Sequence, residues 1–302
     1  MPEHEPAHIY DLIFKRLMRL SQGAIVQFIN GLFNTDYPVD SRLDYPSTET
    51  VTEDLSHVVS DMLILIGGEH LYHIEAQINN DENMALRVFN YGYLEGLKRK
   101  TVEDALITIP FPDARIIYWE TTHKTPDTVT LRLQFPDGNH YDYGVDTFKF
   151  LDHSIHELEE KKLSILLPFY VLKLRKRVTA AQSSQQRQEL SELMKNILEE
   201  LIRTVDHSTQ NGLMTKEDMR TIVNLLGRLY ADLYKSYEEF KGASTMVQEV
   251  LLTYSEEAAL EAELKRSEEI AGSLVQLGMD IEKIAEITKL DIETVKNLAE
   301  QD

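Results

Sequence analysis

The chain of 302 residues contains no cysteine, which excludes disulfide bonds and zinc sites built on thiolates. This absence suits a reducing compartment. The N-terminus lacks the basic region followed by an apolar run that is typical of a signal peptide. No apolar stretch reaches the roughly 18 residues that a membrane-spanning helix needs. We therefore expect a cytoplasmic protein that does not enter a membrane.

An excess of basic residues is also missing, since 51 Asp and Glu oppose 31 Lys and Arg and give a net charge of −20. Proteins that bind nucleic acid usually carry a basic face. Basic residues gather only locally, at 98–100 and at 173–177. These two groups have two interpretations: a local phosphate-binding surface on an acidic body, or solvated helix ends favoured by the helix dipole.

The segment from His57 to Asn80 is predicted to be a β-hairpin. Residues 58–66 are almost continuously apolar, Gly67-Gly68 indicates a turn, and residues 71–78 alternate in character. The first strand contains Asp61. A carboxylate inside an apolar strand is costly to bury unless it is paired or binds a metal ion.

The length of the turn decides which side chains of the hairpin meet. With a three-residue loop over 67–69, Ile66 faces His70, and Asp61 falls opposite Glu75 on one face of the sheet, beside His73 and Gln77. A two- or four-residue loop pairs Asp61 with Ala76 instead and separates the two carboxylates, unless a bulge restores the pairing. The opposite face is apolar and is expected to pack against helices.

Two predicted helices flank this hairpin and carry charged residues of interest. On the first, Asp11 and Lys15 are four residues apart and can form a surface ion pair. On a helix predicted over 84–100, Arg87 and Tyr91 have the same spacing. Arg87 can hold a phosphate through both arms of its guanidinium, or it can be a structural partner of a nearby carboxylate.

The remaining patterns predict an α/β fold followed by helices. A first pair of helices is expected over 8–33 with a break at Gly23, a loop over 37–52, and further strands at 114–120, 129–135 and 141–150. Beyond residue 151 we expect only helices, near 154–178, 185–206, 215–240, 243–253 and 255–277. The tail over 278–302 has the outline of a helix-turn-helix, with Asp280 and Asp291 as caps. Its acidic character favours packing or protein contact over DNA binding.

Several of these pieces together resemble one family. Asp11 and Lys15, Asp61, the run Glu75-Ala76-Gln77, Arg87 with Tyr91, and the segment LLPFYVLKLRK at 166–176 occur in an order similar to the recombination-promoting, transposase-like members of the PD-(D/E)XK nuclease superfamily. The resemblance covers the chain from near residue 8 to beyond residue 235, and a short paired-helix tail also recurs in that family.

The resemblance implies an α/β restriction-endonuclease-like domain with a mixed sheet over 1–178, an all-α region over 179–302, and hydrolysis of DNA phosphodiesters with Mg²⁺ or Mn²⁺. By position, Asp61 and Glu75 would be metal ligands with the backbone carbonyl of Ala76, and Asp11 would be an acidic residue of the site. Lys15 and Arg87 would supply positive charge toward phosphate. Gln77 stands where the superfamily has lysine, a replacement that this family commonly shows.

Two functions from different classes follow from these patterns. The first is a metal-dependent DNA endonuclease, which as a homodimer would cut both strands. The second is a nuclease fold of little or no activity that binds DNA or a protein partner, the latter through the C-terminal helices. A zinc hydrolase that uses His57, His70 and His73 is disfavoured, because no helical HExxH spacing is present.

Overall fold

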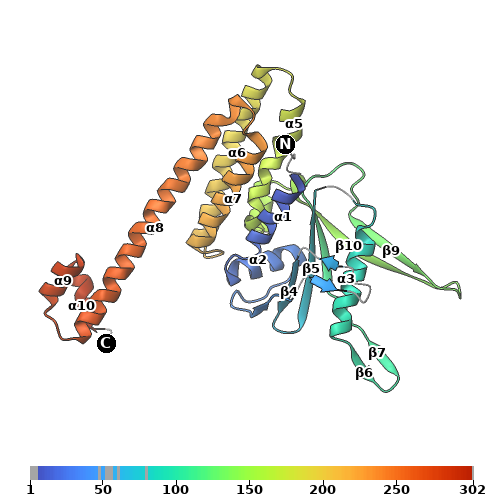
Figure 1. Ribbon diagram of the computed structural model, residues 1–302, viewed down its shortest axis with the longest axis horizontal. Helices are drawn as coiled ribbons and strands as arrows, with labels where there is room; N and C mark the ends of the chain where they lie inside the picture. The colour runs from blue at the N-terminus through green and yellow to red at the C-terminus, as the bar shows by residue number, and fades with distance from the viewer. Residues whose placement is uncertain (1–5, 47–48, 52–56, 60–61, 79–80, 301–302) are drawn as a thin grey trace. The chain divides into compact units, whose positions relative to one another are not determined.

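The computed structural model describes residues 6–46, 49–51, 57–59, 62–78 and 81–300. The chain divides into two compact units, Met1–Ser244 and Thr245–Asp302. The first unit holds the sheet together with the helices up to α7 (Figure 1). The domain boundary predicted at residue 178 falls inside this unit. Within the described ranges, no helix is both long and apolar enough to cross a membrane.

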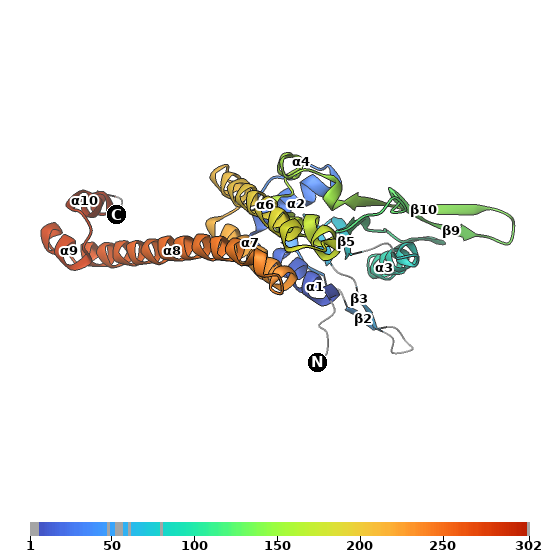
Figure 2. The same cartoon turned by 90° about the horizontal axis from the view of Figure 1, so that it is seen from above.

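A six-stranded mixed sheet forms the centre of the first unit, with the strand order β1-β4-β5-β8-β10-β9. The strand β5 pairs antiparallel with β4 and parallel with β8, and β10 pairs parallel with β8 and antiparallel with β9. The outer β9–β10 ribbon extends past the neighbouring helices (Figure 2). The bounds are Leu43–Asp44 for β1, Met62–Ile66 for β4, His70–Gln77 for β5, Asp113–Tyr118 for β8, Thr128–Gln134 for β9 and His140–Lys149 for β10.

The turn between β4 and β5 has the predicted length. Ile66 is paired with His70, and the register continues through Leu63↔His73 to Met62↔Ile74. Gly67 and Gly68 have positive φ values of 63° and 80°, which a residue with a side chain rarely adopts, so these two glycines permit the short loop. The prediction of a three-residue loop is therefore confirmed.

Helices cover both faces of this sheet. The helices α1 (Pro6–Leu17) and α2 (Gln22–Phe33) pack on the Tyr72 face, where the rings of Phe33 and Tyr72 lie 4.6 Å apart. The helix α3 (Met84–Lys98) lies on the opposite face, where Val88 joins a buried cluster with Ile116 of β8. Figure 1 shows α1 and α2 on one side of the strands and α3 on the other. The predicted helix layer over the apolar face is present, and the Glu75 face is covered as well.

The predicted break at Gly23 is close to the start of α2, which Ser21 caps by accepting a hydrogen bond from the backbone N–H of Ala24. Asp218, which is buried at the start of α7, accepts bonds from the N–H and Oγ of Ser21 at 2.7 and 2.5 Å. The same carboxylate also accepts from Thr215, which caps α7. One side chain therefore joins the starts of two helices, through a bond between residues 197 positions apart.

The first helical segment after the sheet differs from the prediction. The helix predicted over 154–178 is divided into α4 (Ile155–Glu160), the 3₁₀-helix η2 (Ser164–Leu174) and α5 (Arg175–Ala180). Pro168 lies inside η2 and has no N–H to donate to an α-helical ladder. Almost every residue of η2 is buried. The helices α6 (Ser184–Gln210) and α7 (Lys216–Tyr234) are among the elements that cover it. An apolar run of this kind has no helical periodicity from which the ends of a helix could be predicted. The three helices were therefore predicted as one.

Other predicted elements were wrong in detail. The loop predicted over 37–52 contains the short strands β1 and β2 (Glu49–Val51). Residues 57–59 form β3 (His57–Val59), which pairs with β2, and residues 62–66 form β4. Residues 60–61 lie outside the described residues, so a single strand over 58–66 stays a prediction. A small hairpin of β6 (Thr101–Glu103) and β7 (Leu106–Thr108) follows α3 and was not predicted. The strands predicted at 114–120, 129–135 and 141–150 are confirmed by β8, β9 and β10.

The second unit contains most of α8 (Lys241–Gln276) with α9 (Ile281–Thr288) and α10 (Ile292–Glu300). Two separate helices were predicted where α8 is continuous. Asp280 and Asp291 accept backbone hydrogen bonds at the starts of α9 and α10, as the sequence predicted. The unit has a small apolar core of its own, formed by Ala271, Ile284, Leu290 and Val295.

Candidate active site

Among the candidate carboxylates that the structure describes, Glu75 is the one that lies in the sheet. It lies in β5, flanked by β4 and β8, and its side chain is only 2 % exposed. Both of its oxygens have partners: Oε1 is 2.9 Å from Nε2 of His73, and Oε2 is 3.2 Å from Nη2 of Arg87. A buried carboxylate needs such partners to remain charged.

His73 lies on the same face of β5 as Glu75, as the alternation of the strand predicted. Its side chain is fully buried, and its ring packs against Tyr91 of α3 at a centroid distance of 5.2 Å. The Glu75 carboxylate, which also accepts from Arg87, accepts from Nε2–H of His73; within the described residues the buried Nδ1 has no hydrogen-bond partner. His73 therefore fixes the orientation of the Glu75 carboxylate.

Arg87 reaches Glu75 from α3 and is also within 3.6 Å of Asp81, in the turn before that helix. The sequence left two roles open for Arg87, a phosphate contact and a structural partner of a carboxylate. In the structure Arg87 is paired with carboxylates. The arginine is nevertheless 44 % exposed, so its guanidinium borders solvent while Glu75 does not. Arg87 thus connects a buried carboxylate with the surface.

The remaining candidates on the hairpin follow Glu75 along the chain. Gln77 is the last residue of β5, is half-buried, and accepts a backbone hydrogen bond from Trp119 through its own carbonyl oxygen. Ala76 faces the other side of the sheet and is aligned with Ile117 of β8. The amide of Gln77 therefore lies on the same face as Glu75 and at the end of the strand.

Asp11 and Lys15 form an ion pair on α1, with an Nζ–Oδ1 distance of 3.0 Å and both side chains partly exposed. This is the surface pair that their spacing predicted. In the described residues no hydrogen bond or ion pair joins either of them to Glu75. Asp61 lies outside the described residues, so its predicted approach to Glu75 stays a prediction.

Across the residues that the structure describes, no group of three or more His, Asp and Glu side chains is arranged to hold a metal ion. Asp61 is not among these described residues. The resemblance assigns two carboxylates and a backbone carbonyl to the metal ion. These groups are hard oxygen donors, which Mg²⁺ and Mn²⁺ prefer as ligands. Glu75 would have to exchange the Arg87 contact for such an ion.

Sequence reasoning missed another buried carboxylate, Glu120, which follows the end of β8. Arg175 binds it through two parallel hydrogen bonds of 2.8 and 2.9 Å, and Lys176 adds an ion pair at 3.0 Å. The Glu120 side chain is 3 % exposed. The basic residues at 173–177 were the available signal for such a carboxylate, because clustered cations need acidic partners. For Arg175 and Lys176 the partner is this carboxylate.

The environment of Glu120 shifts its pKa. Burial by itself raises the pKa, but the hydrogen bonds from Arg175 and Lys176 outweigh this effect and hold the pKa below its ordinary value. A lowered pKa in the folded state means that the ionised group stabilises the fold at neutral pH. That stabilisation is lost as the pH falls through the folded pKa, below the ordinary value near 4.5.

We expect Glu120→Gln to reduce the free energy of unfolding at pH 7 by about 1–3 kcal/mol, because neutral amides bind the two cations less strongly. The difference from the wild type should shrink as the pH is lowered below about 4.5. Urea denaturation followed by the fluorescence of Trp119, the single and buried tryptophan, measures both quantities. Glu192→Gln removes an exposed ion pair with Lys195 and should have no measurable effect. A difference that stays constant from pH 7 to pH 3 would contradict the assignment.

Comparison with family models, with curated proteins and with solved structures finds no match for this chain.

Proposed function

We propose that the chain is a metal-dependent DNA endonuclease with a restriction-endonuclease-like core, in which Asp61 and Glu75 form the centre of the active site. The observation that carries the proposal is the register of the β4–β5 hairpin. The described pairs end at Met62↔Ile74, and the same register continued by one residue would set position 61 opposite Glu75. This is the arrangement that the resemblance requires.

The surrounding architecture supports the proposal. A mixed sheet flanked by helices is what the resemblance implies for the core. The chain has a mixed sheet in which β5 pairs antiparallel with β4 and parallel with β8, with helices on both faces. Glu75 lies on the inner strand β5, so its backbone is fixed by strands on both sides. A rigid frame of this kind keeps a catalytic carboxylate in one orientation.

The donor set fits a divalent ion in its chemistry. The carboxylates of Asp61 and Glu75 and the backbone carbonyl of Ala76 would hold it. When bound, Mg²⁺ or Mn²⁺ would supply Lewis-acid activation of water and neutralise charge on the phosphate. In the structure Arg87 neutralises the negative charge of Glu75. A bound metal ion would take over this neutralisation and would free the Arg87 side chain.

Three side chains of the chain itself have roles around that centre. His73 holds one oxygen of Glu75 and leaves the other oxygen directed toward Arg87. Arg87, once released from Glu75, can donate two parallel hydrogen bonds to a DNA phosphate from its partly exposed position. Gln77 can orient a water molecule through its amide, but it contributes no positive charge.

A nicking assay on supercoiled plasmid tests the proposal. The purified chain is incubated with the plasmid in EDTA, in Mg²⁺ and in Mn²⁺, and open-circular and linear products are measured over time. We expect products only with a divalent ion. A folded protein that binds the plasmid and leaves it supercoiled under all three conditions would refute the endonuclease.

Gln77→Lys is expected to preserve cleavage at saturating Mg²⁺, or to raise it by up to about tenfold, because an ammonium group would add the charge that Gln77 lacks. The same group attracts Glu75 and competes with the metal ion. The Mg²⁺ concentration for half-maximal rate should therefore increase. Initial rates over a Mg²⁺ titration measure both effects.

The matched control is Gln134→Lys, which adds the same charge at an exposed position of β9. It should leave the rate and the Mg²⁺ requirement as in the wild type. Loss of cleavage by a folded Gln77→Lys protein at every Mg²⁺ concentration would show that position 77 does not tolerate a cation, and would contradict the expected role of a lysine at this position.

One observation favours a second candidate function, a fold that binds DNA or a protein without cutting. Both oxygens of Glu75 are already bonded within the chain, as in a purely structural ion pair. This candidate predicts that binding persists in EDTA and that Glu75→Gln lowers stability without affecting any cleavage. The nicking assay, run beside a gel-shift assay, separates the two candidates.

A further inference from the structure

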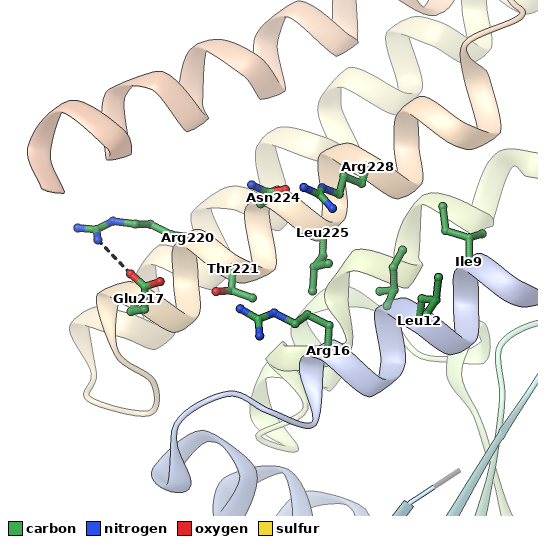
Figure 3. Close-up of a pocket in the computed structure, with 10 residues that line it drawn as sticks. Ile9, Leu12, Arg16, Glu217, Arg220, Thr221, Asn224, Leu225 and Arg228 are labelled. Atoms are coloured by element: carbon green, nitrogen blue, oxygen red, sulfur yellow. Dashed lines mark hydrogen bonds and ion pairs between the residues drawn. The ribbon is translucent and has the colours of Figure 1, made fainter. Parts of the chain in front are cut away.

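A groove of about 520 Å³ lies between α1 and α7, in the first unit. Figure 3 shows Arg16 extending from α1 into the space between the helices, and Leu225 pointing from α7 toward α1. The lining combines an apolar part with a polar part that includes three arginines. Its residues are Ile9, Leu12, Ile13 and Arg16 of α1, and Glu217, Arg220, Thr221, Asn224, Leu225 and Arg228 of α7.

Three arginines supply the cations of this groove. Within the described residues, the side chains of Arg16 and Arg228 have no hydrogen-bond or ion-pair partner, and Arg220 is paired with Glu217 at 3.2 Å. The chain has 51 acidic residues against 31 basic ones, so an arginine could easily have an acidic neighbour. Three arginines against one glutamate give the groove a local excess of positive charge. Such a site attracts an anion.

The apolar part of the groove indicates what else the ligand carries. Leu12 is 52 % exposed on α1, although it is a large apolar residue, and Leu225 forms the opposite wall. Asn224 and Arg228 are neighbours along α7 (Figure 3). An amide can both donate to and accept from the edge of a base, and apolar side chains can contact its flat face. The volume is in the range of small-ligand sites.

We propose that this groove binds a nucleotide, with its phosphate on Arg16 and Arg228 and its base against Leu12 and Leu225. Guanidinium groups match phosphate oxygens with two parallel hydrogen bonds, and phosphate carries more charge than a carboxylate. The nucleotide is either free or the 5′-phosphorylated end of a DNA strand, since both offer the same group. The site is separate from Glu75 and does not depend on cleavage there.

Isothermal titration with the full chain in EDTA tests this site, so that no metal-dependent cleavage contributes. The probes are AMP, inorganic phosphate, and a short single-stranded oligonucleotide with either a 5′-phosphate or a 5′-hydroxyl. The double variant Arg16→Gln/Arg228→Gln is expected to weaken binding of the phosphorylated probes by at least about tenfold. Leu12→Ala should weaken AMP binding and leave inorganic phosphate unchanged.

Arg19→Gln is the matched control, because Arg19 follows α1, is exposed, and does not line the groove. Its affinities should equal those of the wild type, and thermal denaturation should show that all variants are folded. AMP binding without a preference between the two oligonucleotides indicates a free nucleotide, and a preference for the 5′-phosphate indicates a strand end. Unchanged affinity in the double variant, or no binding of AMP together with equal binding of both oligonucleotides, would overturn the proposal.

Discussion

Asp61→Ala is expected to lower metal-dependent plasmid nicking by at least about a hundredfold, since it removes a carboxylate that would hold the metal ion and stabilise charge in the transition state. We expect the described pairs of the hairpin to persist, because Gly67 and Gly68 set the turn. Initial rates of loss of supercoiled plasmid at saturating Mg²⁺ measure the effect.

The matched control for this experiment is Glu69→Ala. Glu69 is an exposed carboxylate in the turn of the same hairpin, and its removal should leave the rate within about twofold of the wild type. Both variants are purified in the same way as the wild type, and an empty-vector preparation monitors contaminating nuclease. Nicking by Asp61→Ala at the wild-type rate would end the assignment of the hairpin as a catalytic site.

Gly31→Ala is expected to lower the free energy of unfolding by about 3 kcal/mol or more. A Cβ atom at Gly31 would lie 1.8 Å from the backbone oxygen of Lys161, which follows α4. The obstacle is backbone and cannot be relieved by a change of rotamer, so α2 would have to move away from its neighbour. Urea denaturation followed by Trp119 fluorescence measures the loss.

Gly23→Ala is the control on the same helix. A Cβ atom there meets nothing closer than 3.9 Å, so the substitution should be neutral or should stabilise the fold by up to about 1 kcal/mol. A Gly31→Ala protein as stable as Gly23→Ala would mean that α2 is not held against residue 161 as the structure describes.

Features set by neighbouring residues could be predicted from the sequence. Gly67 and Gly68 determined the turn and therefore the pairing of Ile66 with His70. Asp280 and Asp291 were recognisable as helix caps because a cap acts on N–H groups two or three residues away. The strands β8, β9 and β10 were recognisable by their composition.

Features set by distant residues could not be predicted. Nothing near Arg87 in the sequence indicates that it binds Glu75 instead of remaining free, and the pairing of Glu120 with Arg175 joins residues 55 positions apart. The 3₁₀-helix at 164–174 is apolar on most sides, and ten of its eleven residues are buried by other elements, so it lacks the periodicity that marks a surface helix. The groove between α1 and α7 likewise exists only once the two helices are together.

The carboxylate of Asp218 has a consequence for the order in which the chain folds. Ser21, at the start of α2, obtains its acidic partner only from a residue 197 positions later. During synthesis, the first two helices must therefore remain without this contact until α7 has left the ribosome. A contact over so long a loop forms slowly, because the entropy of closing the loop is lost before the bond is gained. We infer that the docking of α7 beside the N-terminal helices is a late event in folding, and that chains truncated before residue 218 leave the start of α2 incompletely fixed.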